Sequence, residues 1–191
     1  MQTKRLFIAA ELPDALIENI HLVVKTQWPV AYKGIKWIPL DQYHLTLKFL
    51  GDTPIDLIPA IRKICEKSVK PGLSFPIEIS GFGVFPDQNH PTVLWAGIQP
   101  AHALIDFQKS LDKSLNQINI PQEKRPFKPH LTLARIKDFF PKQKLPQLLS
   151  PLQNGSQVLQ LSTFIQKITL FESQLSKQGP VYQALWTQLI Q

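Results

Sequence analysis

The stretches HLTLKFLG, residues 44–51, and HLTLARI, residues 130–136, decide the expected fold. They repeat the phrase His-Leu-Thr-Leu in a chain of 191 residues that has only five histidines. Each phrase alternates leucine with a polar residue, which is the pattern of a half-buried β-strand. Successive side chains of a strand point to opposite faces. Each phrase is therefore expected to anchor its strand through the leucines and to present an imidazole and a hydroxyl together.

Strict alternation groups the polar side chains of each phrase. It places His44, Thr46 and Lys48 on one face of the first strand, and His130 and Thr132 on one face of the second. A single His-x-Thr pair is common on a half-exposed strand and carries little information. Two pairs framed by the same leucines favour a shared cleft, in which each of two lobes supplies one imidazole and one hydroxyl.

Helical and extended patterns alternate along the rest of the chain. Apolar residues recur at helical spacing in residues 14–25, 54–70 and 101–118. Residues 73–98 contain two apolar runs joined by a polar turn, which predicts a hairpin, and the last forty residues suggest terminal strands. Helices interleaved with neighbouring strands favour an α+β fold in which helices cover antiparallel sheets.

The composition describes a folded chain with an excess of positive charge. Apolar residues make up 43% of it, and the formal net charge is +7, which favours an anionic partner such as nucleic acid or a phosphate ester. Cys65 is the single cysteine and the N-terminus lacks a signal-peptide core, so we expect a cytoplasmic protein. No apolar run reaches about eighteen residues, so we expect no membrane-spanning helix.

Two imidazoles and two hydroxyls at one cleft suit acid–base chemistry at a phosphate. Imidazole titrates near neutral pH, so one ring can act as the base while the other acts as the acid. Threonine hydroxyls can donate hydrogen bonds to the non-bridging oxygens of a phosphate. The sequence has no C-x-x-C or H-E-x-x-H cluster of the kind that binds zinc. We therefore expect neither a metal nor a cofactor to take part.

Several phrases of the chain, taken in order, resemble the 2H phosphoesterase family and its branch of RNA 2′,3′-cyclic phosphodiesterases, once called 2′-5′ RNA ligases. They are RLFIAAELP, KWIPLDQYHLTLKFLG, GFGVFP, VLWAGI, KRPFKPHLTLAR and LFESQLSKQGPVY. The resemblance implies a bilobal α+β fold, with two antiparallel sheets facing a central cleft, helices on the outside and a pseudo-two-fold axis. Residues 1–191 would then form a single domain of two packed lobes.

The resemblance also implies an activity and a role for each motif residue. The activity would be metal-independent hydrolysis of an RNA 2′,3′-cyclic phosphate to a 2′-phosphomonoester. His44 would protonate the departing 3′ oxygen, and His130 would activate water. Thr46 and Thr132 would hold the phosphate oxygens. Arg135, five residues after the second histidine, would also contact the phosphate, but only if a bulge or the end of the strand turns it from the face that strict alternation gives it.

Two further side chains are candidate substrate contacts. Lys48 shares the parity of His44, and Phe127 lies in the basic loop before the second motif, where it could stack on a base.

Two alternative functions stay open. The same site could catalyse the reverse reaction and join a 2′,3′-cyclic phosphate end to a 5′-hydroxyl as a 2′-5′ bond. The cleft could also bind RNA or a nucleotide without catalysis, although binding alone would tolerate loss of either imidazole. We expect a monomer.

Overall fold

The computed structural model describes residues 2–70, 72–73, 75–99, 102–153, 160–177 and 179–190. Its helices and strands, in chain order, are β1 (Thr3–Glu11), α1 (Asp14–Gln27), β2 (Ile35–Trp37), β3 (Leu45–Pro54), α2 (Ile58–Ser68), β4 (Pro76–Phe85), β5 (Val93–Gln99), α3 (His102–Asn116), β6 (His130–Ile136), α4 (Leu145–Leu149), β7 (Gln160–Phe164), β8 (Lys167–Ser176) and β9 (Gly179–Leu189). Among the described residues, no helix is long and apolar enough to cross a membrane.

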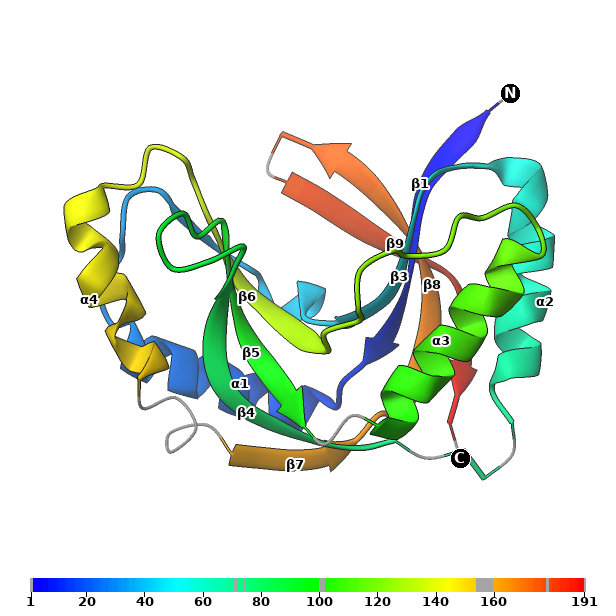
Figure 1. Cartoon of the computed structure of the whole chain (residues 1–191), viewed down its shortest axis with the longest axis horizontal. Helices are drawn as coiled ribbons and strands as arrows, with labels where there is room; N and C mark the ends of the chain where they lie inside the picture. The colour runs from blue at the N-terminus through cyan, green and yellow to red at the C-terminus, as the bar shows by residue number, and fades with distance from the viewer. Residues whose placement is uncertain are drawn as a thin grey trace.

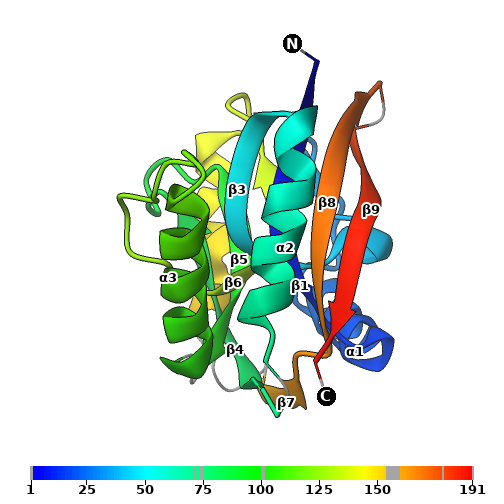
Figure 2. The same cartoon turned by 90° about the vertical axis from the view of Figure 1, so that its right-hand side faces the viewer.

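The strands form two antiparallel sheets. The first sheet has the strand order β3-β1-β8-β9, and the second has the order β2-β6-β5-β4-β7. Helices α2 and α3 lie side by side on the outer face of the first sheet (Figure 2), and α1 and α4 lie against the second (Figure 1). This arrangement confirms the expected α+β fold, with two antiparallel sheets and helices on the outside.

The core is built by the apolar side of each element. The leucines that frame the two motifs are all buried, as their alternation predicts: Leu45, Leu47, Leu131 and Leu133. Trp28 closes α1 and donates a hydrogen bond from Nε1 to the carbonyl oxygen of Leu148 in α4, at 2.8 Å. Its ring also packs edge-on against Phe82 of β4. These contacts fix α1 and α4 on the second sheet.

The two halves of the chain repeat one connection. Helix α1 follows β1 of the first sheet but packs on the second, and α3 follows β5 of the second sheet but lies beside α2 on the first. After the first crossing the chain adds β2 to the second sheet and then returns to the first, where β3 pairs with β1. After the second crossing it returns to the second sheet, where β6 pairs with β5. The result is the expected pseudo-two-fold arrangement, with β3 and β6 as equivalent strands.

Candidate active site

The cleft between the two sheets holds a cavity of about 400 Å³. Strands β1, β3, β8 and β9 of the first sheet line one side of it, and β6 of the second sheet contributes to the other. Its lining includes His44 and Thr46 from the first motif, and Thr132 and Arg135 from the second. The fold therefore brings the two distant motifs to one cavity.

His44 lies just before β3, and both of its ring nitrogens have partners. Nδ1 lies 2.8 Å from the carbonyl oxygen of Gln42, and Nε2 lies 3.1 Å from Oγ1 of Thr46. A carbonyl oxygen only accepts, so Nδ1 is the protonated nitrogen of the neutral ring. Nε2 is then the nitrogen that can take up or release a proton. The rings of Phe7 and Tyr182 hold the imidazole, with centroids 4.9 and 5.3 Å away.

His130, the first residue of β6, is held in the same way. Its Nδ1 donates to the carbonyl oxygen of Lys128 at 2.7 Å, two residues earlier in the chain, as Gln42 is two residues before His44. Its ring packs edge-on against Phe85 at 4.9 Å between centroids. Nε2 is again left as the reactive nitrogen, so the pseudo-symmetry extends to the tautomer of each imidazole.

Burial lowers the pKa of both imidazoles. For His44 it lowers the pKa from 6.5 to about 4, against the opposing effect of the hydrogen bond to Gln42, and the charges of His130 and Arg135 lower it further. Burial also lowers the pKa of His130, against the effect of its hydrogen bond to Lys128. An anion bound between the rings would favour their charged forms and raise both pKa values.

Each motif strand carries a β-bulge directly after its threonine. In β3, Thr46 pairs with Ala9 and Lys48 pairs with Ile8, so Leu47 is the extra residue. A bulge of one residue reverses the alternation of the side chains that follow it.

The corresponding bulge in β6 turns Arg135 to the cavity. Thr132 pairs with Trp95 and Ala134 pairs with Leu94, so Leu133 is the extra residue. Arg135 is exposed and lines the cavity. The structure thus contains the bulge on which its expected place depends, while its contact with a phosphate stays a prediction.

The bulge in β3 has the opposite consequence for Lys48. The prediction that Lys48 shares the face of His44 is wrong, because Leu47 interrupts the alternation. Lys48 is only 6% exposed, forms an ion pair with Asp112 of α3, and donates a hydrogen bond to the carbonyl oxygen of Pro121 at 2.6 Å. It does not line the cavity, so its position gives no support to a substrate contact.

Phe49 takes the place that alternation gave to Lys48. It lines the cavity and is 72% exposed, whereas alternation assigned it to the buried face with Leu47. Phe49 lies three residues after Thr46, as Arg135 lies three residues after Thr132, so the two side chains are equivalent in the pseudo-symmetry.

Phe127, the candidate substrate contact in the basic loop, does not face the cavity as Phe49 does. Phe127 is half-buried, packs against the hydrophobic core and does not line the cavity. Its position therefore gives no support to stacking on a base within this cavity.

Several cleft residues lie outside both motifs, so sequence reasoning missed them. Tyr182 of β9 packs edge-on against His44; burial raises the pKa of its phenol, and the charges of Arg135 and Arg5 act in the opposite direction. Trp95 shares the cleft face of the second sheet with Thr132, its strand partner. Both residues lie in phrases that carry the family resemblance, VLWAGI and LFESQLSKQGPVY, but neither phrase indicates a place in the cleft, which strand pairing provides.

Gly83 has no side chain, and the indole of Trp95 occupies the space that a side chain there would fill. A Cβ at position 83 would lie 2.1 Å from the ring of Trp95, which is closer than any contact between such atoms. A glycine in a strand often marks this kind of close approach. The ring of Trp95 in turn lies edge-on to His130, with centroids 6.3 Å apart.

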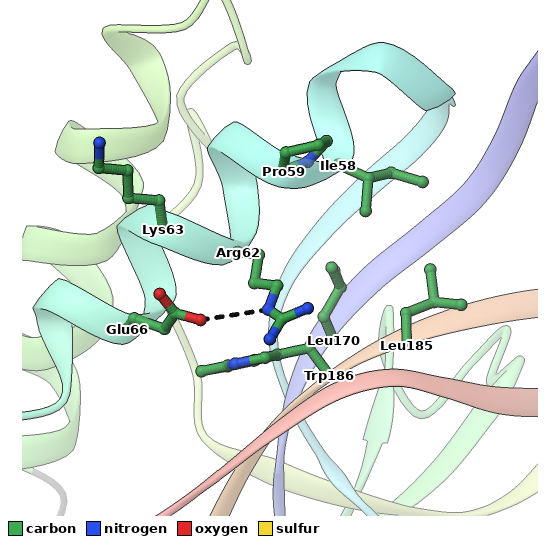
Figure 3. A pocket seen from close by; sticks show the side chains of 8 residues that line it. All are labelled: Ile58, Pro59, Arg62, Lys63, Glu66, Leu170, Leu185 and Trp186. Carbon is green, nitrogen blue, oxygen red and sulfur yellow. Dashed lines mark hydrogen bonds and ion pairs between the residues drawn. The ribbon is translucent and has the colours of Figure 1, made fainter.

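A second pocket, of about 470 Å³, lies on the outer face of the first sheet, between α2 and strands β8 and β9 (Figure 3). Its lining includes Trp186 and the Arg62–Glu66 ion pair, with Nε and Oε1 3.1 Å apart. None of its lining side chains is a histidine or carries a hydroxyl. It therefore lacks the groups that the chemistry of the cleft requires.

A comparison with models of known protein families shows to which superfamily the chain belongs. The model of the 2′-5′ RNA ligase superfamily matches residues 11–170, a range that includes both motifs. The chain belongs to this superfamily. The resemblance inferred from the quoted phrases is confirmed.

Relatives of this superfamily member carry a consistent name. Proteins named RNA 2′,3′-cyclic phosphodiesterase include one from Methanothermobacter thermautotrophicus, 30% identical over 178 residues, covering 93% of this chain and 94% of the relative. Another, from Aquifex aeolicus, is 35% identical over 150 residues and covers 77% of each chain.

Solved structures share the fold of this superfamily member. The crystal structure of a protein from Thermus thermophilus superposes with a TM-score of 0.78 at 27% identity, covering 97% of both chains. Escherichia coli LigT in its apo form superposes with a TM-score of 0.73 at 24% identity, covering 99% of this chain and 98% of LigT.

Proposed function

We propose that this protein hydrolyses RNA 2′,3′-cyclic phosphate ends to 2′-phosphomonoesters. The observation that carries the proposal is the convergence of two His-x-Thr pairs, because His44, Thr46 and Thr132 line one cavity and His130 lies two residues before Thr132. The names of the curated relatives support the choice of a cyclic phosphate as the substrate.

The proposed reaction uses each imidazole once. With the cyclic phosphate between Thr46 and Thr132, their hydroxyls donate to the non-bridging oxygens, and Arg135 adds a positive charge. Nε2 of His130 takes a proton from water as the water oxygen bonds to phosphorus. The bond from phosphorus to the 3′ oxygen breaks, and Nε2 of His44 gives that oxygen its proton. One proton enters the site from water and one leaves to the product, while the phosphate stays on the 2′ oxygen.

The hydrogen bonds and the pKa shifts support this use of the two rings. Each Nδ1 is committed to a backbone carbonyl, so each Nε2 is the atom available for proton transfer. In the free protein, the low pKa of His44 keeps its ring mostly neutral near pH 7. A bound phosphate raises that pKa and so produces the acid form when the substrate is present. The assignment of His44 as the acid and His130 as the base follows the family resemblance.

We propose further that the reaction needs no metal. Among the described residues, no group of three histidine, cysteine, aspartate or glutamate side chains could hold a metal ion. Arg135 and the two threonines offer the donors that a developing negative charge requires. Activity should therefore persist in EDTA, and loss of activity in EDTA that magnesium or zinc restores would contradict this part of the proposal.

The decisive experiment identifies the product. A short RNA ending in a 2′,3′-cyclic phosphate is incubated with the unsubstituted protein, with His44→Ala and with His130→Ala. His90→Ala is the matched control, because His90 is an exposed histidine in the turn between β4 and β5. A 2′-phosphate made only by the unsubstituted protein and the control would support the proposal. A 3′-phosphate, or a cyclic end that survives, would overturn it.

The same assay with an added 5′-hydroxyl RNA would detect the reverse reaction as a 2′-5′ joined product. The cytoplasmic location, the single-domain organisation and the monomeric state expected from the sequence stay predictions.

A further inference from the structure

Arg5 lies in the cavity but belongs to neither motif. It is exposed, and it lines the same cavity as His44 and Thr46. Along β1 it lies four residues before Ala9, which pairs with Thr46. At about 3.3 Å per residue, its backbone is about 13 Å of strand away from the motif threonine. Arg5 therefore occupies a part of the cavity apart from the two threonines.

The guanidinium of Arg5 forms no ion pair within 4 Å among the described residues. No carboxylate of a described residue lines the cavity. Asp52 is the strand partner of Arg5, yet no ion pair within 4 Å joins them among the described residues. The charges of Arg5 and Arg135 both act on the Tyr182 phenol, which lies in the same cavity. Two guanidinium groups thus face one cavity, while a cyclic mononucleotide brings a single phosphate.

Exposed apolar side chains share the cavity with Arg5. Phe49 of β3 is 72% exposed and Leu175 of β8 is 79% exposed, and both line it. Aromatic and apolar surface beside a cation is the combination that single-stranded nucleic acids use, since the bases stack while the backbone meets the charge. This surface favours a nucleotide chain over a small inorganic anion.

We propose that Arg5 binds the phosphodiester group that links the terminal cyclic nucleotide to the nucleotide before it. The site then prefers a substrate of two or more nucleotides over a nucleoside 2′,3′-cyclic phosphate. Arg135 serves the reacting phosphate, and Arg5 serves its neighbour. This inference rests on the proposed function and adds to it a binding site for the second phosphate of the RNA.

The test compares two substrates on the same proteins. The substrates are a nucleoside 2′,3′-cyclic phosphate and a dinucleotide that ends in the same cyclic nucleotide. The proteins are the unsubstituted chain, Arg5→Gln, Arg5→Lys and a control, Arg62→Gln. Arg62 lies on α2, on the outer side of the first sheet, so its substitution removes the same charge away from the cleft. Equal melting temperatures establish that the variants are folded.

We expect the unsubstituted protein and the control to prefer the dinucleotide. Arg5→Gln should lower kcat/KM about tenfold on the dinucleotide, as loss of a charge-assisted contact in a solvated site would, and less than about threefold on the mononucleotide. Arg5→Lys should recover part of the loss, because it keeps the charge but not the planar fork. On the dinucleotide, Arg5→Gln should also reduce the slope of log(kcat/KM) against log(salt) by about one.

Each other outcome has a definite meaning. Equal losses on both substrates would show that Arg5 serves the reacting phosphate, and no loss on either would show a solvated side chain; both results overturn the inference and leave the proposed function standing. If the unsubstituted protein cleaves neither substrate, the proposed function fails and the inference fails with it.

Discussion

Substitution of Lys48 by methionine should destabilise the fold and leave substrate affinity nearly unchanged. Lys48 and Asp112 are only 6% and 7% exposed, and they form a buried ion pair. The ammonium also donates to the carbonyl oxygen of Pro121, while Oδ2 of Asp112 accepts from the N–H of Glu123 at 3.1 Å. The pair therefore ties β3, which carries Thr46, to the loop that leads to the second motif.

The expected loss of stability comes from the Asp112 carboxylate, which the substitution leaves buried without its cation. Removing one partner of a buried ion pair costs about 3–5 kcal/mol. The remaining hydrogen bond from Glu123 to Asp112 places this case near the lower value, about 3 kcal/mol of the free energy of unfolding. For a chain of this size, that corresponds to a fall in Tm of about 6–12 °C.

Urea unfolding followed by tryptophan fluorescence measures the effect. Lys63→Met, on the exposed side of α2, is the matched control and should change the free energy of unfolding by less than about 0.5 kcal/mol. The double variant Lys48→Met with Asp112→Leu should recover most of the loss, because it leaves no buried charge unpaired. An unchanged free energy of unfolding, together with a raised KM for Lys48→Met alone, would show that the ion pair does not stabilise the fold and would restore Lys48 as a candidate substrate contact.

Three other results are expected. His44→Ala and His130→Ala should each lower kcat by about a hundred- to ten-thousand-fold in steady-state assays with unchanged unfolding curves, and full activity in a folded variant would exclude the assigned role. The kcat/KM profile should be bell-shaped with its maximum below pH 6.5, because one ring must be charged and burial lowers both pKa values, that of His44 to about 4; a flat profile from about pH 5 to 9 would contradict it. Gly83→Ala should displace Trp95 and cost about 1–3 kcal/mol in a urea titration, and unchanged stability and near-ultraviolet circular dichroism would show that the space exists.

The motif strands were predictable because their information is local. Leu131, Thr132 and Leu133 are consecutive residues that alternate apolar and polar side chains. Their alternation correctly predicts that both leucines are buried. Two copies of the phrase also indicated a shared cavity, which Thr46 and Thr132 do line.

Alternation alone could not predict that Phe49 faces the cavity and that Lys48 is buried. The bulge at Leu47 depends on the pairing of β3 with β1, which lies far away in the chain. For β6, either a bulge or the end of the strand was required if Arg135 was to reach the phosphate, and the structure has a bulge at Leu133. Arg5 and Tyr182 come to the cavity because β1 pairs with β8 and β8 pairs with β9. The hairpin of β8 and β9 is local, but no short-range pattern indicates the pairing of β1 with β8.

The end of β7 shows the same limit. Apolar and polar residues alternate in residues 164–173, which suggests one continuous extended segment, yet the chain leaves the second sheet at Phe164 and enters the first at Lys167. Ile165, between them, is buried and donates its N–H to the carbonyl oxygen of Phe75. A switch between sheets keeps the backbone extended, so the pattern of apolar residues does not reveal it.

His44 and His130 are proposed to act as acid and base on one phosphate. A nucleoside 2′,3′-cyclic phosphate whose 3′ bridging oxygen is replaced by sulfur separates these two roles. A thiolate leaves without a proton far more readily than an alkoxide, because thiols are much stronger acids, with a pKa of about 8.5 for cysteine. We expect sulfur to restore most of the rate of His44→Ala and to leave His130→Ala slow. Rescue of His130→Ala, or of neither variant, would contradict this assignment.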